Sequence, residues 1–283
     1  MSKKQKTEIL RGAEGFEQFY FSLYGERWNS LKQAFTKPSD SVEYKIPGSQ
    51  KSYFLDSASI LAALSLPLEN AQNILDLCAA PGGKTLVLAS RMSEMSKLSA
   101  NERSPQRKQR LSTVVQECLP IEISERIIVS CSDGSTWCTR QNECFDSILL
   151  DAPCSSERHV IADPKYLNQW SPSRIKTVTM EQWALLSSAF RLLKKGGFLL
   201  YSTCALCHQE NDQMMERLIK KFIKNQETPE FSFVEPAPDI NQIKNYANVE
   251  LPIYEKTKFG YQILPDTAAG AGPIYFSLIK KSE

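Results

Sequence analysis

The feature that most constrains the fold is a set of short apolar runs, each ending in polar or reactive residues. The run that ends at Leu150 is followed by DAPCSSERH (residues 151–159), and the run 74–77 is followed by CAAPGGKT. A third run, 198–202, is followed by Thr-Cys. Runs of this length are typical of buried strands. Ligands bind outside the carboxyl ends of the strands in open α/β sheets. The sequence therefore predicts a site where these three strand ends meet.

Segments with helical spacing alternate with the apolar runs. Further strands are predicted at 97–101, 127–130, 231–234 and 274–279. Residues 53–66 begin with Tyr-Phe-Leu and continue as a helical pattern that Asp56 or Ser57 could cap, and further helices are predicted at 85–92, 105–119, 178–193 and 210–224. This alternation predicts an α/β fold with a mostly parallel sheet and helices on both faces. Residues 160–176 lack periodicity and are predicted to be a long connection, and residues 194–197 a turn.

The N-terminal part has a different pattern. Aromatic and apolar residues recur at helical spacing from Glu14 to Phe35, and Gly25 is expected to separate two helices. We interpret this aromatic stripe as core packing rather than as a surface that stacks on bases. Pro38–Gly48 is predicted to be a connector with turn residues. The sequence thus predicts a helical extension (residues 1–50) ahead of one larger α/β domain (residues 51–283).

Composition excludes few partners. The formal net charge is only +2, so any contact with nucleic acid has to come from a local patch. We find no secretory signal and no apolar run long enough to span a membrane, which predicts the cytoplasm or an organelle matrix and reduced thiols for the eight cysteines. A zinc site at the Cys204–Cys207 pair is disfavoured because such sites need four ligands, so no metal is expected.

Three consecutive strand ends carry groups that could hold one ligand. Small residues in the glycine-rich loop would let backbone N–H groups approach a ligand, although a simple tight turn is the alternative. Glu102 could accept hydrogen bonds from ribose hydroxyls or be a surface acid. Asp133 could contact an adenine amino group, although a turn is favoured at that position. Together they predict an adenosine-bearing ligand along the sheet edge. The loop consists of Cys78, Ala79, Ala80, Pro81, Gly82, Gly83 and Lys84.

Cys154 and Cys204 are candidates for nucleophilic chemistry. The thiolate is the nucleophile, and an ordinary thiol with a pKa of ~8.5 is mostly protonated at neutral pH. A cation such as Lys84 or Arg158 would therefore have to lie nearby. The alternative is that both cysteines are small buried residues.

These motifs, taken together, resemble the NOL1/NOP2/Sun family of RNA cytosine-5 methyltransferases. LDLCAAPGGKT is similar to the family's S-adenosylmethionine loop, and DAPCS and STC are similar to its two cysteine motifs; ANERSPQR fits the intervening pattern. The resemblance covers roughly residues 53–224. It implies a Rossmann-like class I S-adenosylmethionine-dependent methyltransferase with a mostly parallel seven-stranded sheet. FEQFYFSLYGERWNSL (residues 16–31) resembles the mitochondrial-type branch, which implies rRNA or tRNA as substrate.

The resemblance also implies roles for individual residues. The loop would hold the methionine end of the cofactor, Glu102 the ribose and Asp133 the adenine. Asp151 would face both cofactor and target cytosine and polarise the base. Cys204 would attack the base and Cys154 would assist release, although DNA cytosine methyltransferases use the Pro-Cys cysteine for attack.

RNA binding and substrate choice stay open at this stage. No segment resembles an additional RNA-binding domain, so a protein partner is a further expectation. An enzyme that methylates DNA or protein, and a non-catalytic RNA-binding factor with the same fold, are the alternatives. The cations that could contact phosphates are Arg103, Arg107, Lys108, Arg110, Arg158, Lys165 and Arg174.

Overall fold

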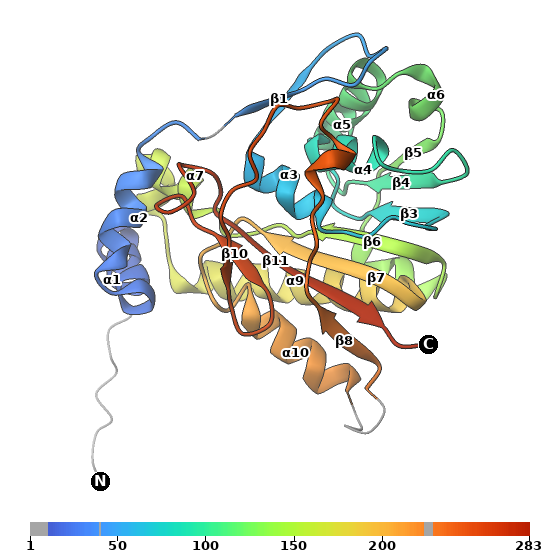
Figure 1. Ribbon diagram of the computed structural model, residues 1–283. Helices are drawn as coiled ribbons and strands as arrows, with labels where there is room; N and C mark the ends of the chain where they lie inside the picture. Colours follow the sequence, from blue (N-terminus) through green and yellow to red (C-terminus); the bar gives the residue numbers. More distant parts are fainter. Residues whose placement is uncertain (1–10, 40, 224–228) are drawn as a thin grey trace.

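A single mixed β-sheet forms the centre of the molecule (Figure 1). The computed structural model describes residues 11–39, 41–223 and 229–283. The strand order is β5-β4-β3-β6-β7-β11-β10-β9, and β8 pairs with β11 beside this path. The first five of these strands are parallel. They are β3 (Asn73–Asp76), β4 (Lys97–Asn101), β5 (Ile127–Ser130), β6 (Phe145–Asp151) and β7 (Leu193–Thr203).

The remaining strands run antiparallel to their neighbours. β11 (Ile274–Lys281) pairs with β7 on one side and with both β10 (Tyr261–Ile263) and β8 (Phe231–Val234) on the other. The strands therefore occupy seven neighbouring positions, with β8 and β10 sharing the seventh, and the two-residue β9 (Glu255–Lys256) follows β10. The expected mostly parallel sheet is confirmed.

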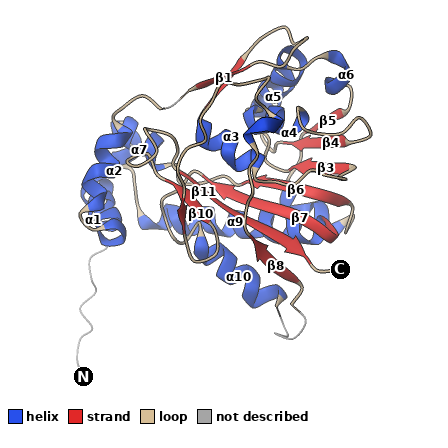
Figure 2. Cartoon of the chain, in the orientation of Figure 1, coloured by secondary structure: helices blue, strands red, loops and turns tan. Residues whose placement is uncertain are grey.

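Helices cover both faces of the sheet, as Figure 2 shows. Because side chains alternate along a strand, Leu149 packs in one apolar cluster while Ile148 and Leu150 pack in the other. One cluster contains residues of α3 (Ser57–Leu64), α4 (Gly83–Ala89) and α5 (Pro105–Cys118). The other contains residues of α9 (Pro172–Leu192) and α10 (Asp212–Phe222). Shorter helical segments are α6 (Ile121–Ser124), η1 (Gly134–Thr139) and η2 (Ile240–Gln242).

The N-terminal helices form as expected, and the aromatic stripe is core. Gly25 separates α1 (Gly12–Tyr24) from α2 (Arg27–Phe35). Tyr20 and Trp28 are fully buried and stack with ring centroids 5.1 Å apart. Their cluster also contains Trp170, so the stripe packs against the larger part of the chain.

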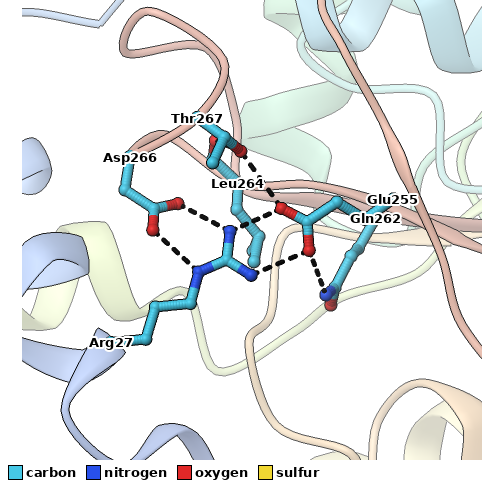
Figure 3. Close-up of polar contacts among 6 residues, drawn as sticks. All are labelled: Arg27, Glu255, Gln262, Leu264, Asp266 and Thr267. Carbon is cyan, nitrogen blue, oxygen red and sulfur yellow. Dashed lines mark hydrogen bonds and ion pairs between the residues drawn. The ribbon is translucent and has the colours of Figure 1, made fainter.

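Arg27 fastens α2 to the C-terminal part of the chain (Figure 3). Its Nε donates to Asp266 at 2.8 Å, and its Nη1 donates to Glu255 at 2.8 Å. The pKa of Glu255 is lowered by this guanidinium. Two-pronged arginine–carboxylate bonds add orientation as well as energy, so this contact sets how α2 lies on the chain.

Three local expectations are wrong. The predicted connector 38–48 contains β1 (Val42–Tyr44), which pairs with β2 (Tyr53–Leu55), so residues 1–50 are not wholly helical. The predicted connection 160–176 is largely helical and contains α7 (Glu157–Ala162) and α8 (Pro164–Asn168). The predicted turn 194–197 lies within β7, at an irregularity of its pairing with β6.

Other expectations stay open. The division into residues 1–50 and 51–283 stays a prediction, and its residues 1–10 and 40 lie outside the described residues, as does Lys224 of the predicted helix 210–224. None of the helices in the described part of the chain combines the length and the hydropathy of a bilayer-spanning segment.

Candidate active site

A cavity of about 540 Å³ lies at the carboxyl ends of the parallel strands. Its volume is within the range of ~300–1,000 Å³ that is usual for small-molecule sites. It brings together the groups that the sequence places at separate strand ends. Of the predicted site residues, it is lined by Cys78, Ala80, Pro81, Lys84, Glu102, Asp133, Asp151, Cys154 and Cys204.

The two glycines of the loop lie where neighbouring elements approach closely, and their part in binding a ligand stays a prediction. A Cβ on Gly82, whose φ is +120°, would lie 2.8 Å from a methyl carbon of Val114 in α5. A Cβ on Gly83 would lie 2.9 Å from the ring of Tyr53 in β2. These contacts require glycine because neighbouring elements approach closely. Neither glycine lines the large cavity, and Ala79 and Gly83 instead line a smaller one of about 180 Å³.

Glu102 is buried and held in one orientation. Its Oε1 accepts from the backbone N of Ser104 at 2.8 Å, and its Oε2 lies 3.1 Å from Nη1 of Arg107. The same guanidinium donates to the carbonyl of Ala80 at 2.6 Å. Arg107, a candidate phosphate contact in the sequence, therefore links the glycine-rich loop to Glu102.

Asp133 forms the predicted turn, and its contact with adenine stays a prediction. Its side chain accepts from the backbone N of Ser135 at 3.0 Å and from the Ser135 hydroxyl at 2.7 Å, which caps η1. It is also exposed and lines the cavity. The turn interpretation is thus correct, and it leaves a carboxylate at the cavity edge.

Asp151 ends β6 with both carboxylate oxygens engaged. Oδ2 accepts from Nζ of Lys84 at 2.8 Å, and Oδ1 accepts from the hydroxyl of Ser202 at 2.8 Å. The Lys84 side chain is only 12% exposed. Because the lysine is largely buried and both carboxylate oxygens are engaged, Asp151 is held in one orientation between the loop and β7.

The two candidate cysteines meet at the cavity. The structure joins Cys154 and Cys204 by a disulfide, with Cα atoms 6.3 Å apart, while the other six cysteines are free. The expectation of reduced thiols is therefore wrong for this pair. Arg158, a candidate to activate a thiol, donates instead to the carbonyls of Gly270 and Gly272, both at 2.8 Å.

Sequence reasoning missed Asp76, the last residue of β3. Its Oδ2 accepts from the Thr85 hydroxyl at 2.7 Å, while Oδ1 has no partner and the carboxyl is buried. Burial raises its pKa to about 7. Asp76 lines the smaller cavity. The available signal was an acid within an apolar strand next to the loop, which is typical of a residue with a perturbed pKa at a functional site.

The chain matches the model of the family described as 16S rRNA methyltransferase RsmB/F over residues 63–272, which is more than half of its length. Among curated proteins it is 31% identical over 229 residues to the 5-cytosine rRNA methyltransferase NSUN4 of Mus musculus, covering 79% of this chain and 58% of that protein. It is 37% identical over 173 residues to the ribosomal RNA small subunit methyltransferase F of Aliivibrio salmonicida, covering 60% of this chain and 36% of that protein. The chain thus spans about half the length of these relatives, or less.

Solved structures show the same fold. NSun6 from Pyrococcus horikoshii, determined with SFG, superposes with a TM-score of 0.64 at 21% identity, covering 83% of this chain and 54% of that chain. A methyltransferase homologue from the same organism superposes with a TM-score of 0.70 at 22% identity, covering 94% of each chain. These likenesses support a Rossmann-like class I methyltransferase fold.

Proposed function

Since the chain belongs to the RsmB/F family of 16S rRNA methyltransferases, we propose that it transfers a methyl group from S-adenosylmethionine to carbon 5 of a cytosine in RNA. The observation that carries this proposal is the convergence of Asp151, Cys154 and Cys204 on one cavity with Glu102 and Asp133. The five residues come from the ends of four strands, and their assembly supplies an anion, two sulfurs and two acceptors for an adenosine-bearing ligand.

The residues fit S-adenosylmethionine. Glu102 is buried and fixed, so its carboxylate can accept hydrogen bonds from ribose hydroxyls, and Asp133 offers an acceptor for the adenine amino group. Cys78 and Ala80 line the cavity beside them and would face the methionine end. When bound, S-adenosylmethionine supplies an electrophilic methyl group on a positively charged sulfur.

Cys204 is assigned as the nucleophile. Its thiolate adds to C6 of cytosine, a Sγ–C6 bond forms, and the displaced electron pair makes C5 nucleophilic, which divides one difficult step into easier ones. Asp151 is assigned to the base, where its carboxyl group in the protonated form donates to N3 and so stabilises the negative charge that develops on addition. Lys84 keeps Asp151 in place through the 2.8 Å ion pair.

Cys154 is assigned to release. After methylation the thiolate of Cys154 accepts the C5 proton, the electron pair of the C5–H bond forms the C5–C6 double bond, and the Sγ–C6 bond breaks with its electrons returning to Cys204. Attack requires a free thiolate, so the Cys154–Cys204 disulfide has to be reduced first. The assignment therefore includes a requirement for a thiol reductant.

We propose rRNA as the substrate, because the relatives named above are rRNA methyltransferases, with tRNA as the second candidate. A protein partner would assist targeting, in the cytoplasm or an organelle matrix. The need for a partner is supported by the cations at the cavity, which are already paired: Arg103 pairs with Glu181 at 2.9 Å, and Arg107 pairs with Glu102. Paired cations give weaker phosphate contacts.

The test is the identity of the product. Purified protein, reduced with dithiothreitol, is incubated with S-adenosylmethionine carrying a deuterated methyl group and with total RNA, DNA or protein in parallel. Nuclease digestion and mass spectrometry should find deuterated 5-methylcytidine from the RNA arm. Label in another nucleoside, in DNA or in protein would contradict the proposal. A chain with the fold but no catalysis would transfer no label.

The cofactor assignment predicts weaker S-adenosylmethionine binding for Glu102→Gln and Asp133→Asn. A hydrogen bond to a charged group is worth ~1.5–3 kcal/mol, so Kd measured by calorimetry should rise by about 10-fold or more for each variant. Glu117→Gln is the matched control, because Glu117 pairs with Lys51 on the exposed side of α5. Unchanged Kd in both site variants would remove these residues from the cofactor site.

A further inference from the structure

Two buried glutamates lie beside the cysteine loops and do not line the cavity. Glu157 comes three residues after Cys154, and Glu210 comes six residues after Cys204. Both side chains are fully buried. Burying a carboxyl group is costly unless its oxygens are hydrogen-bonded, so the partners of these two groups indicate what they do.

Each glutamate binds the backbone of the other cysteine's loop. Oε2 of Glu157 accepts from the backbone N of Leu206 at 3.0 Å. Oε2 of Glu210 accepts from the backbone N of Ser155 at 3.0 Å. The residue after Cys154 is thus tied to the loop of Cys204, and a residue just after Cys204 is tied to the loop of Cys154. The contacts form a reciprocal brace between the two loops.

Gln182 of α9 completes the brace. Its Nε2 donates to Oε2 of Glu210 at 2.9 Å and to the carbonyl of Pro153, the residue before Cys154, at 2.9 Å. Oε1 of Gln182 and Oε1 of Glu210 are both buried without a partner. The two side chains are in contact through the bond from Nε2 to Oε2, and a proton on Glu210 would add a donor beside these two acceptors, because a protonated carboxyl group donates as well as accepts.

Glu157 has the opposite arrangement. Tyr20 and Ser155 donate their hydroxyl protons to its Oε1, and the backbone N of Leu206 donates to Oε2. Burial raises the pKa of Glu157, and the hydrogen bonds from these three donors oppose that rise because they favour the charged carboxylate.

We propose that Glu157 and Glu210 are positioning residues that hold Cys154 and Cys204 at the separation their chemistry requires, and that Glu210 does so as a neutral acid sharing its proton with Gln182. The role in methyl transfer rests on the function proposed above; the brace itself does not. Fixing two reacting groups relative to each other is a large part of catalysis, and displacements of about 1 Å cost rate.

The surroundings of Glu210 favour the proton. Burial, followed by the charge of Glu157, raises its pKa to about 7. The titratable groups that interact with Glu210 are Glu157, Tyr20, Tyr201 and Cys207, and none of them is a cation. The folded protein therefore keeps this proton at a pH where the unfolded chain has lost it. The stability contribution is present at low pH and is lost as pH rises toward about 7.

The test uses one substitution of Glu210 that removes its ionisable group and keeps the contacts of the brace, and others that remove or weaken these contacts. Glu210→Gln keeps an acceptor for Ser155 and offers an N–H to Oε1 of Gln182, so it replaces a neutral acid without loss of the brace. Glu210→Leu removes the brace. Glu210→Asp is one methylene shorter and cannot reach Ser155 in the same way, and it serves if the leucine variant does not fold. Glu216→Gln is the control in α10, the helix that begins two residues after Glu210, where Glu216 pairs with Lys258.

The first readout is the closeness of the two thiols, measured without RNA. In glutathione buffers the protein dithiol and one glutathione disulfide exchange to give the Cys154–Cys204 disulfide and two glutathione thiols. Alkylation and peptide mapping give the equilibrium constant at pH 7. We expect a fall of about 10-fold or more in Glu210→Leu and Glu210→Asp, and values within about 2-fold of the wild type in Glu210→Gln and Glu216→Gln. Wild-type values in all four variants would overturn the brace.

The second readout is unfolding by urea between pH 5 and 8. The wild type should lose stability relative to Glu210→Gln as pH rises, because only the wild type has a proton to lose at this position. Asp76 is present in both proteins, so its effect on the pH dependence of stability cancels in the comparison. If the difference in unfolding free energy between the wild type and Glu210→Gln stays constant with pH, Glu210 is not a neutral acid.

Single-turnover methylation then connects the brace to function, since Glu210→Asp should lower the rate and leave Kd for S-adenosylmethionine unchanged. A shifted thiol equilibrium in a protein that methylates no RNA would leave the brace intact and refute the proposed function.

Discussion

Cys154→Ala is expected to accumulate a complex with substrate RNA that survives denaturing electrophoresis, and Cys204→Ala is expected to form none. Both sulfurs line one cavity, and their Cα atoms are 6.3 Å apart, so either can reach a base placed there. If Cys204 attacks C6, enzyme and RNA are covalently joined until the C5 proton leaves and the Sγ–C6 bond breaks. Loss of Cys154 should therefore block release more than attack.

The variant that lacks both cysteines tests whether attack by Cys204 has to come before release by Cys154. It should lose the complex, because attack precedes release, and Cys204→Ala alone should lose methyl transfer while it still binds S-adenosylmethionine. All assays contain a thiol reductant, and Cys131→Ala, which removes an exposed free cysteine, is the control. An adduct only in Cys204→Ala would mean that the two roles are exchanged. No trapped RNA in either variant of an active enzyme would assign Cys154 a structural role.

Asp151→Asn should lower the single-turnover rate of methylation by about 10²–10³-fold, which is the usual loss when one electrostatic group at a reacting centre is removed. The carboxylate balances the charge of Lys84, which is largely buried, and it accepts from Ser202. An asparagine supplies neither the charge for Lys84 nor an acid that can exchange a proton with the base. The variant should also lose stability, because a mostly buried cation is left without its partner.

Asp146→Asn is the matched control for this measurement. Asp146 lies near the other end of the same strand, β6, and also pairs with a lysine, Lys194, at 2.7 Å. Lys194 holds the pKa of Asp146 below its usual range despite partial burial. This control should lose stability and keep its rate. A wild-type rate in Asp151→Asn would show that Asp151 has no part in the chemistry.

The sequence by itself determined the class of fold and most members of the site. Apolar runs of strand length alternating with helical patterns are decided locally, because side-chain spacing along the chain specifies which face of an element is buried. Residues that directly follow such runs, including Asp151 and Cys204, must then lie at one edge of a parallel sheet. Their meeting in one cavity could be predicted for that reason. The same reasoning failed at residues 42–44, where pairing with β2, the next strand along the chain, outweighs local turn residues.

The tertiary structure decided the contacts between residues that are far apart in the chain. Lys84 lies on Asp151 across 67 positions, and Ser155 binds Glu210 across 55. No spacing rule relates such pairs, because their distance depends on how whole elements pack. The same holds for the close approach of α5 to Gly82 and of β2 to Gly83, which leaves no room for a Cβ at either position. The protonation of Glu210 belongs here too, since burial and neighbours set its pKa and both exist only in the folded chain.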